Sequence, residues 1–200
     1  MTEQEFGELL ALGHEKRGLE FKGPGKRTDR AFFALVVRAI LGMANRQDGG
    51  VVVIGVADDG AALGPTGLAL EQLDTWTHDA TGDGLAEYAD PPVEFTLERV
   101  RFQSKDFILL RVDEFDEVPV LCKQDYPQTL RKGACYVRAR RKPETSEIPA
   151  QAEMRELIDL ATSKRLRKTL GMLRDAGVDL SATAPLGDVE LFDQQIKDLL

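Results

Sequence analysis

The sequence predicts an α+β fold, in which helices flank a mixed β-sheet. Helical patterns alternate with short β-rich runs in the first half of the chain, and several β-rich runs follow one another in the second half. This order is typical of a mixed sheet with helices packed on it. The chain has 200 residues, of which 42% are apolar, and this is enough to bury one sizeable core. We expect one domain over residues 1–160 and a C-terminal helical extension over residues 161–200.

The N-terminal part predicts a helix followed by a short strand. Apolar side chains recur at helical spacing at Phe6, Leu9, Leu10 and Leu12. They follow Thr2 and Glu5, which form a capping pattern, and so predict a helix that ends near Gly13. Residues 19–22 predict a strand, and the glycines and proline of residues 23–25 close it.

The next two elements carry the strongest patterns in the chain. Thr28 and Asp29 are helix caps, and the helix they open is expected to end at Ala44. Its apolar side is expected to consist of Phe32, Leu35, Val36, Ala39, Ile40 and Met43. Residues 51–56 are apolar apart from one glycine, which is the pattern of a central strand covered on both faces.

Glycine and proline residues indicate where the remaining elements begin and end. A helix is expected over about residues 68–80, and a loop rich in glycine and proline follows it. Strands are expected over residues 93–100, 107–112 and 135–139, and helical structure over about 150–176 with a short acidic segment at 188–200. The proline residues of this half lie in the connections, where a missing N–H does least harm.

Three acidic residues form a candidate metal site. Glu15 and Glu20 are five residues apart at the entrance of the strand at 19–22, and Asp58 follows the apolar strand at 51–56. If the two strands pair, these carboxylates can meet around one divalent cation, because Mg²⁺ and Mn²⁺ prefer oxygen ligands. Such a cation activates water for phosphodiester cleavage. Lys22 lies on the same strand face as Glu20 and is the fourth candidate catalytic residue, which could hold the phosphate or stabilise the developing negative charge.

The same residues also fit a purely structural role. Glu20 and Lys22 can form an ion pair on one strand face, and the Asp58-Asp59-Gly60 sequence suits a tight turn. Asn45 and the glycines at 49–50 fit a helix end and a turn. From periodicity alone, this second interpretation is favoured over a metal site.

A local basic patch points to nucleic acid, although the formal net charge is −8. Phosphate neutralisation by such clusters dominates nonspecific binding. The candidate nucleic-acid-binding residues are Lys22, Arg46, Arg131, Lys132, Tyr136, Arg138, Arg140, Arg141 and Lys142, with Tyr136 as a stacking side chain. A second basic cluster over residues 164–174 fits a solvated helix face.

Several function classes are excluded or unsupported by the sequence. The segment at 25–28 does not match an ATP-binding phosphate loop, because Glu20 occupies the position of the first glycine. Cys122 and Cys135 lack the spacing of a zinc site, so we expect reduced, packed thiols and neither zinc nor ATP. The longest apolar stretch, residues 31–44, is shorter than the roughly 20 residues of a membrane span. The acidic first residues lack the features of a secretory signal, and we expect a cytoplasmic protein.

Taken in order, these motifs resemble the Schlafen AlbA-type domain family, formerly described as a divergent ATPase and a putative DNA-binding domain. The matching elements are Glu15-x-x-x-x-Glu20-Phe21-Lys22-Gly23, Ala44-Asn45, Gly49-Gly50, Gly55-Val56-x-Asp58-Asp59-Gly60 with Gly64, Pro91-Pro92, Pro119 and Tyr136-Val137-Arg138. They cover roughly residues 9–160. Two features depart from the family pattern: its vertebrate zinc-binding residues have no counterpart, and Ala57 stands where many microbial relatives have aspartate.

The resemblance implies a specific activity and assembly. In the Schlafen proteins that cleave RNA, the family pattern assigns a metal-binding acid triad to the positions of Glu15, Glu20 and Asp58, with Asp59 as the alternative to Asp58. Those enzymes are tRNA and rRNA endoribonucleases that use Mg²⁺ or Mn²⁺, and two related lobes form their basic cleft. This chain has about one lobe, so a homodimer is expected.

Two main hypotheses follow from the sequence. The first is a metal-dependent endoribonuclease that cleaves structured RNA such as tRNA. The second is a noncatalytic DNA- or RNA-binding regulatory module, in which the acids are structural. A third interpretation is an assembly protein that acts through its acidic surface.

Overall fold

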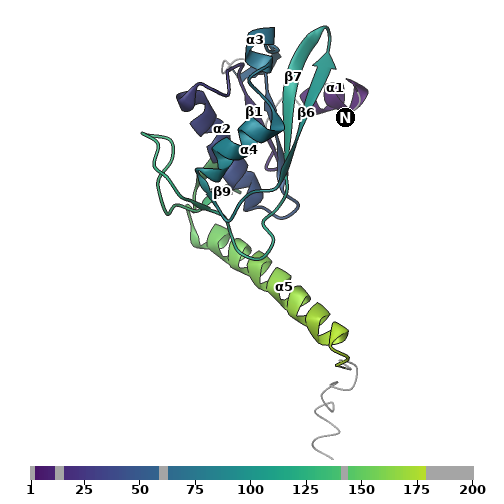
Figure 1. The fold of residues 1–200 in the computed structure, drawn as a ribbon, viewed down its shortest axis with the longest axis vertical. Coiled ribbons are helices and arrows are strands. Elements are labelled where there is room, and N and C mark those ends of the chain that lie inside the picture. Colours follow the sequence, from purple (N-terminus) through teal and green to yellow (C-terminus); the bar gives the residue numbers. More distant parts are fainter. Residues whose placement is uncertain (1–2, 12–15, 59–62, 141–143, 179–200) are drawn as a thin grey trace, which may run out of the picture. The chain divides into compact units, whose positions relative to one another are not determined.

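A four-stranded mixed sheet forms the centre of the fold (Figure 1). The computed structural model describes residues 3–11, 16–58, 63–140 and 144–178. The sheet has the order β1-β2-β7-β6, with β1 at Leu19–Lys22, β2 at Gly50–Ile54, β7 at Lys105–Val112 and β6 at Phe95–Phe102. β1 and β2 run parallel, and the other neighbours run antiparallel. The predicted α+β class is therefore confirmed, and the pairing of the first two strands, on which the candidate metal site depended, is present.

Helix α2, Arg30–Ala44, covers one face of this sheet and contributes most to the larger core. Its N-cap is Asp29, whose side chain accepts hydrogen bonds from the backbone N–H groups of Ala31 and Phe32. This arrangement satisfies two of the four free N–H groups that every helix start leaves. One residue of the predicted apolar side lies elsewhere, because Leu35 is 44% exposed.

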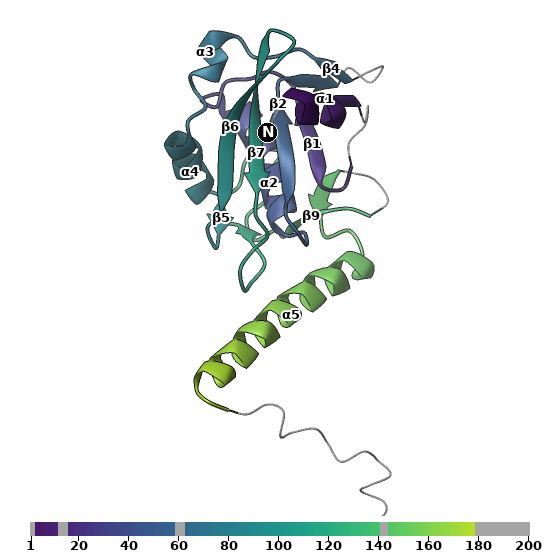
Figure 2. The same cartoon turned by 90° about the vertical axis from the view of Figure 1, so that its right-hand side faces the viewer.

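Helix α1, Glu3–Ala11, packs on the opposite face and closes a second, smaller core. Its Phe6 is fully buried, and its ring centroid lies 5.0 Å from that of Phe107. Figure 2 shows α1 lying across the strands on this side of the sheet. Because strand side chains alternate between faces, Leu19 and Phe21 point into this core. Glu20 and Lys22 therefore point to the α2 side.

The sequence predicted one strand over residues 51–56. The structure differs, because the strand is interrupted at Gly55. Gly55 has φ of 108°, a conformation that only glycine adopts readily. After it, β3 at Val56–Asp58 pairs with β4 at Leu63–Pro65 instead of continuing the central sheet.

The single helix expected over 68–80 is two helices, α3 at Leu70–Leu73 and α4 at His78–Ala86. Thr77 caps α4, and its side chain accepts a hydrogen bond from the Ala80 N–H. Trp76, between the two helices, is fully buried and donates from its indole N–H to the Gly25 carbonyl at 3.0 Å. The predicted helix is therefore interrupted around Trp76, whose side chain packs into the core.

Short strands and a long helix complete the described chain. β5 at Ala89–Asp90 pairs with β8 at Leu121–Cys122, and β9 at Tyr136–Arg138 pairs with β10 at Thr145–Glu147. Helix α5 extends over Gln151–Asp175. The chain divides into two compact units, residues 1–162 and 163–200. Within the described ranges, no helix is long and apolar enough to cross a membrane.

Candidate functional site

Glu20 lies at the centre of the candidate site, and its carboxylate is enclosed by the protein's own donors. The residue is 6% exposed. Its Oε1 accepts a hydrogen bond from the Lys22 Nζ, and its Oε2 accepts from Arg138 Nη1 and from Thr145 Oγ1, the last at 3.0 Å. β1 supplies Glu20 and Lys22, β9 supplies Arg138, and β10 supplies Thr145. Both oxygens of the carboxylate are therefore already bonded.

Arg138 is the buried partner that compensates the charge of Glu20. Its side chain is fully buried. The guanidinium group donates to three backbone carbonyls at the start of β1, those of Lys16, Arg17 and Leu19, each at 3.1 Å. Arg138 was expected on an exposed basic patch, and that expectation is wrong. The β9–β10 hairpin packs beside α2 and directs this side chain under the edge of the sheet.

The other two acids of the predicted triad are only partly described. Glu15 and Asp59 lie outside the described residues, and of Asp58 only the backbone, at the end of β3, is described. β3 contacts β1, so the backbone of Asp58 belongs to a strand beside the one that carries Glu20. No group of three His, Cys, Asp or Glu residues within the described ranges has the geometry of a metal site. Oε2 of Glu20 already accepts two hydrogen bonds, and Oε1 accepts one, from Lys22. A metal ion bound by Glu20 would therefore share the carboxylate with these donors.

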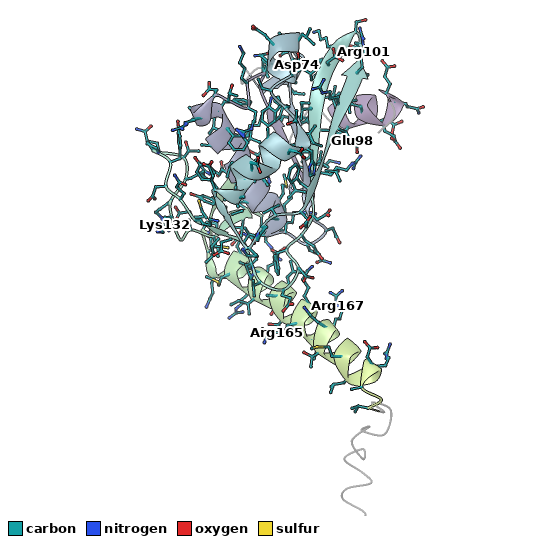
Figure 3. The ribbon with its side chains drawn as sticks, in the orientation of Figure 1. Asp74, Glu98, Arg101, Lys132, Arg165 and Arg167 are labelled. Carbon is teal, nitrogen blue, oxygen red and sulfur yellow. The ribbon has the colours of Figure 1, made fainter. Side chains whose placement is uncertain are left out.

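The predicted basic patch separates into exposed and buried members. Arg131 and Lys132 are exposed, and Figure 3 shows Lys132 on the outer loop that precedes β9. Arg131 is bonded to the Glu147 carboxylate, and Arg140 donates to Glu156 at 3.0 Å. Arg141 and Lys142 lie outside the described residues.

Two further members of the patch have internal roles. Tyr136 was expected to stack on bases at the surface but is 2% exposed, and its hydroxyl accepts a hydrogen bond from the Arg131 backbone N–H at 2.9 Å. Arg46 is partly buried and donates to the carbonyls of Gln47 and Gly49. Arg46 therefore braces the turn before β2.

Asn45 is a structural residue whose role exceeds what the sequence indicated. It is 5% exposed. Its Nδ2 donates to the carbonyls of Val120 and Tyr136 at 2.8 and 2.9 Å, and its Oδ1 accepts from the Val120 N–H at 2.7 Å. Asn45 therefore joins the end of α2 to two later segments. The sequence showed only a helix end, because no local pattern reveals partners 75 and 91 residues away.

The two cysteines are free thiols in apolar surroundings. Cys122 is buried, and Cys135 is partly buried beside Asn45. Burial raises the pKa of the Cys135 thiol to about 11 and also raises the pKa of Cys122. Because the thiolate is the reactive form, both side chains are poor nucleophiles at neutral pH.

Glu156 links three segments beside the candidate site. Its carboxylate accepts from Arg17 Nη1 and Nη2 at 2.7 and 2.6 Å, and from Arg140 Nε. The hydrogen bonds from Arg17, opposed by burial and aided by Arg140, lower the pKa of Glu156. These bonds tie the beginning of α5 to the segments that hold Glu20 and Arg138.

Replacing Glu156 with glutamine should lower the free energy of unfolding at pH 7 by about 1–2 kcal/mol, since the charge-assisted bonds are partly solvent-screened. A lowered folded-state pKa stabilises the protein above the unfolded-state value, and this contribution is lost as the pH falls. The difference between wild type and variant should therefore shrink below about pH 4, near the ordinary glutamate pKa. Urea unfolding at several pH values measures it, and a constant difference from pH 7 to pH 3 would contradict the assignment.

Comparison with known proteins identifies the family of this domain. The family model described as Schlafen, AlbA_2 matches residues 15–146. The chain belongs to the Schlafen AlbA_2 family. The match includes Glu20, Lys22, Asn45, Arg138 and Thr145, so the Schlafen AlbA_2 domain contains the whole network around Glu20. As a member of this family, the chain contains a nucleic-acid-related domain.

Similar folds are found among solved structures at low sequence identity, one of them with a TM-score of 0.50. The DIP2311 protein from Corynebacterium diphtheriae matches with a TM-score of 0.50 and 12% identity, over 75% of this chain and 27% of that one. This Schlafen AlbA_2 chain therefore spans about a quarter of DIP2311. The N-terminal domain of a putative ATP-dependent DNA helicase RecG-related protein from Nitrosomonas europaea has a TM-score of 0.45 and 19% identity, over 66% and 88% of the two chains. No curated protein sequence matches the chain.

Proposed function

We propose that this Schlafen AlbA_2 domain is a noncatalytic nucleic-acid-binding module that favours structured RNA. The family match supports a role with nucleic acid. The bonding of Glu20 favours binding over cleavage, because Lys22, Arg138 and Thr145 occupy both of its oxygens. A metal ion bound at Oε2 would compete with Arg138 and Thr145, and one bound at Oε1 would lie beside the Lys22 ammonium group. Displacement of Arg138 would cost the buried carboxylate its strongest partner.

The proposed contact surface is the exposed loop that carries Arg131 and Lys132, together with Arg140 on the β9–β10 hairpin. Surface cations of this kind neutralise phosphates and release counterions, which gives salt-sensitive binding. The second unit carries exposed Arg165 and Arg167 on α5 (Figure 3), and these are available for further phosphate contacts. Such phosphate contacts do not depend on the base sequence.

Metal-dependent RNA cleavage is the second candidate function. It is favoured by the contact between β3, which ends at Asp58, and β1, which carries Glu20 and Lys22. In this proposal Glu15, Glu20 and Asp58 hold Mg²⁺ or Mn²⁺, and the metal supplies a nucleophile and charge stabilisation. A homodimer would provide the second lobe of a cleft in either case, and sedimentation at micromolar concentration tests it.

One electrophoresis experiment tests the proposed function. Labelled tRNA is incubated with the protein in Mn²⁺, Mg²⁺ or chelator, and each sample is run on a native gel and on a denaturing gel. We expect a retarded complex that is independent of metal and contains intact RNA. Lys132→Glu should weaken the complex several-fold, whereas Glu71→Lys, an exposed charge change of opposite sign on α3, should not weaken it.

The same gels separate the two candidates. Fragments that require metal and disappear in Asp58→Asn would replace the binding proposal with the cleavage proposal. The absence of a complex in every condition would contradict both candidates. Asp58→Asn is chosen because it removes a candidate metal ligand while Glu20 and its described donors, Lys22, Arg138 and Thr145, are unchanged in sequence.

A further inference from the structure

Arg38 is a positively charged side chain that makes no hydrogen bond or ion pair with another described residue. It lies in the middle of α2, and its Nε is buried without a hydrogen bond. Its guanidinium lies over the Tyr136 ring, whose centroid is 5.6 Å away, and its charge acts on the nearby Glu147 carboxylate. A buried polar group that stays unpaired costs about 1–3 kcal/mol. Such groups in native proteins therefore call for a specific explanation.

The Arg38 side chain lines a cavity of about 460 Å³. The other walls are Tyr136 of β9, Glu147 of β10, Arg131 and the loop at residues 125–130. This volume lies within the range of about 300–1,000 Å³ that is typical of small-ligand sites. The loop contributes the partly buried ring of Tyr126 and the apolar side chains of Pro127 and Leu130, so the cavity combines a cation with aromatic and apolar surface.

Of the two described cations that line this cavity, Arg38 is the one that makes no hydrogen bond or ion pair. The hydrogen bond from Arg131 and, to a smaller extent, the charge of Arg38 lower the pKa of Glu147. Arg131 donates three hydrogen bonds to the Glu147 carboxylate. Asp125 Oδ1 accepts a hydrogen bond from the Lys132 backbone N–H at 2.8 Å. Both acids of the cavity wall are therefore engaged by other groups. An anion that entered the cavity would meet the guanidinium of Arg38 and restore its hydrogen bonds.

We propose that this cavity binds the phosphate of a nucleotide, with Arg38 as the phosphate ligand. The planar guanidinium group matches phosphate geometry and forms paired hydrogen bonds with it. The cavity is larger than one phosphate, and its aromatic and apolar walls fit the sugar and base that carry the phosphate. The inference rests on the proposed function and deepens it: nonspecific contacts of Lys132 and its neighbours hold the strand, and the Arg38 cavity holds one nucleotide unit, such as a strand end.

The test compares ligands that differ only in the phosphate. Fluorescence anisotropy measures binding of a 5′-phosphorylated and a 5′-hydroxyl oligoribonucleotide of the same sequence, and calorimetry measures binding of AMP and of inorganic phosphate. We expect the wild type to bind the phosphorylated strand at least fivefold more tightly. Arg38→Met should abolish this preference and leave the affinity for the hydroxyl strand unchanged, and Arg38→Lys should retain part of it.

The outcomes distinguish this inference from the proposed function. Equal affinity of the wild type for the two strands, together with no binding of AMP, overturns the Arg38 cavity but leaves nucleic-acid binding intact. Binding of AMP with no preference between the strands identifies a free nucleotide as the source of the phosphate. Binding of AMP without binding of either strand contradicts the proposed function instead. Thermal unfolding of Arg38→Met should show no loss of stability, because the substitution removes an unpaired donor, so a lost preference would not reflect unfolding.

Discussion

Replacing Arg138 with alanine should lower the free energy of unfolding by about 3–5 kcal/mol, the range measured when one partner of a buried ion pair is removed. The substitution leaves the Glu20 carboxylate buried beside Thr145 and removes the donor from three carbonyls at the start of β1. For a domain of this size the loss corresponds to about 10 °C in the midpoint of thermal unfolding. Calorimetry measures both quantities.

Arg140→Ala is the matched control for this prediction. Arg140 lies two residues away on the same hairpin, but its side chain is exposed and its bond to Glu156 is screened by solvent. Its removal should cost about 1 kcal/mol or less. Equal effects of the two substitutions would show that Arg138 is not a buried counter-ion. A double variant, Glu20→Leu with Arg138→Met, should recover much of the stability that Arg138→Ala loses, because it removes both charges.

Replacing Asn45 with alanine should be the second most damaging change, with an expected loss of about 3 kcal/mol. Alanine leaves the Val120 N–H and the carbonyls of Val120 and Tyr136 without partners in the core, and each buried unsatisfied group costs about 1–3 kcal/mol, with effects that are not fully additive. Urea unfolding measures the loss. The exposed neighbour Gln47 provides a control, because Gln47→Ala should change the stability by less than about 0.5 kcal/mol.

Asn45→Asp separates hydrogen bonding from side-chain size. Aspartate keeps the acceptor for the Val120 N–H but cannot donate to the two carbonyls, and it buries a negative charge. We expect it to be at least as destabilising as alanine at pH 7. A variant with wild-type stability would contradict the role assigned to the Nδ2 group.

Local patterns were sufficient for the elements that determine the fold class. Asp29 and the apolar spacing after it predicted α2, and the apolar run before Gly55 predicted the central strand β2. The break at Gly55 and the split of the helix at Trp76 were not predicted. Both involve contacts with distant residues, which local periodicity does not contain. The Gly55 N–H donates to the Lys22 carbonyl, and the Trp76 indole N–H donates to the Gly25 carbonyl.

The candidate site was less predictable, because the sequence does not show whether a charged residue is exposed to ligands or buried in an ion pair. Arg138 was grouped with its basic neighbours and assigned to the surface, whereas it is paired with Glu20 across 118 residues of sequence. The ion pair of Glu20 and Lys22, which the alternative structural interpretation proposed, is present. The sequence assigned no role to Arg38. An isolated arginine within an apolar helix is the one sequence signal that pointed to it.

We propose that this Schlafen AlbA_2 domain binds nucleic acid through surface cations and leaves it intact. The most direct measurement is the affinity of the wild type for labelled tRNA at several salt concentrations, with the RNA recovered afterwards on a denaturing gel. We expect the logarithm of the binding constant to fall linearly with the logarithm of the salt concentration, with a slope of about −2 to −3 for three phosphate contacts. We also expect full-length RNA in the recovered sample. A salt-independent affinity, no binding at low salt, or RNA cut in the presence of Mn²⁺ would contradict this proposal.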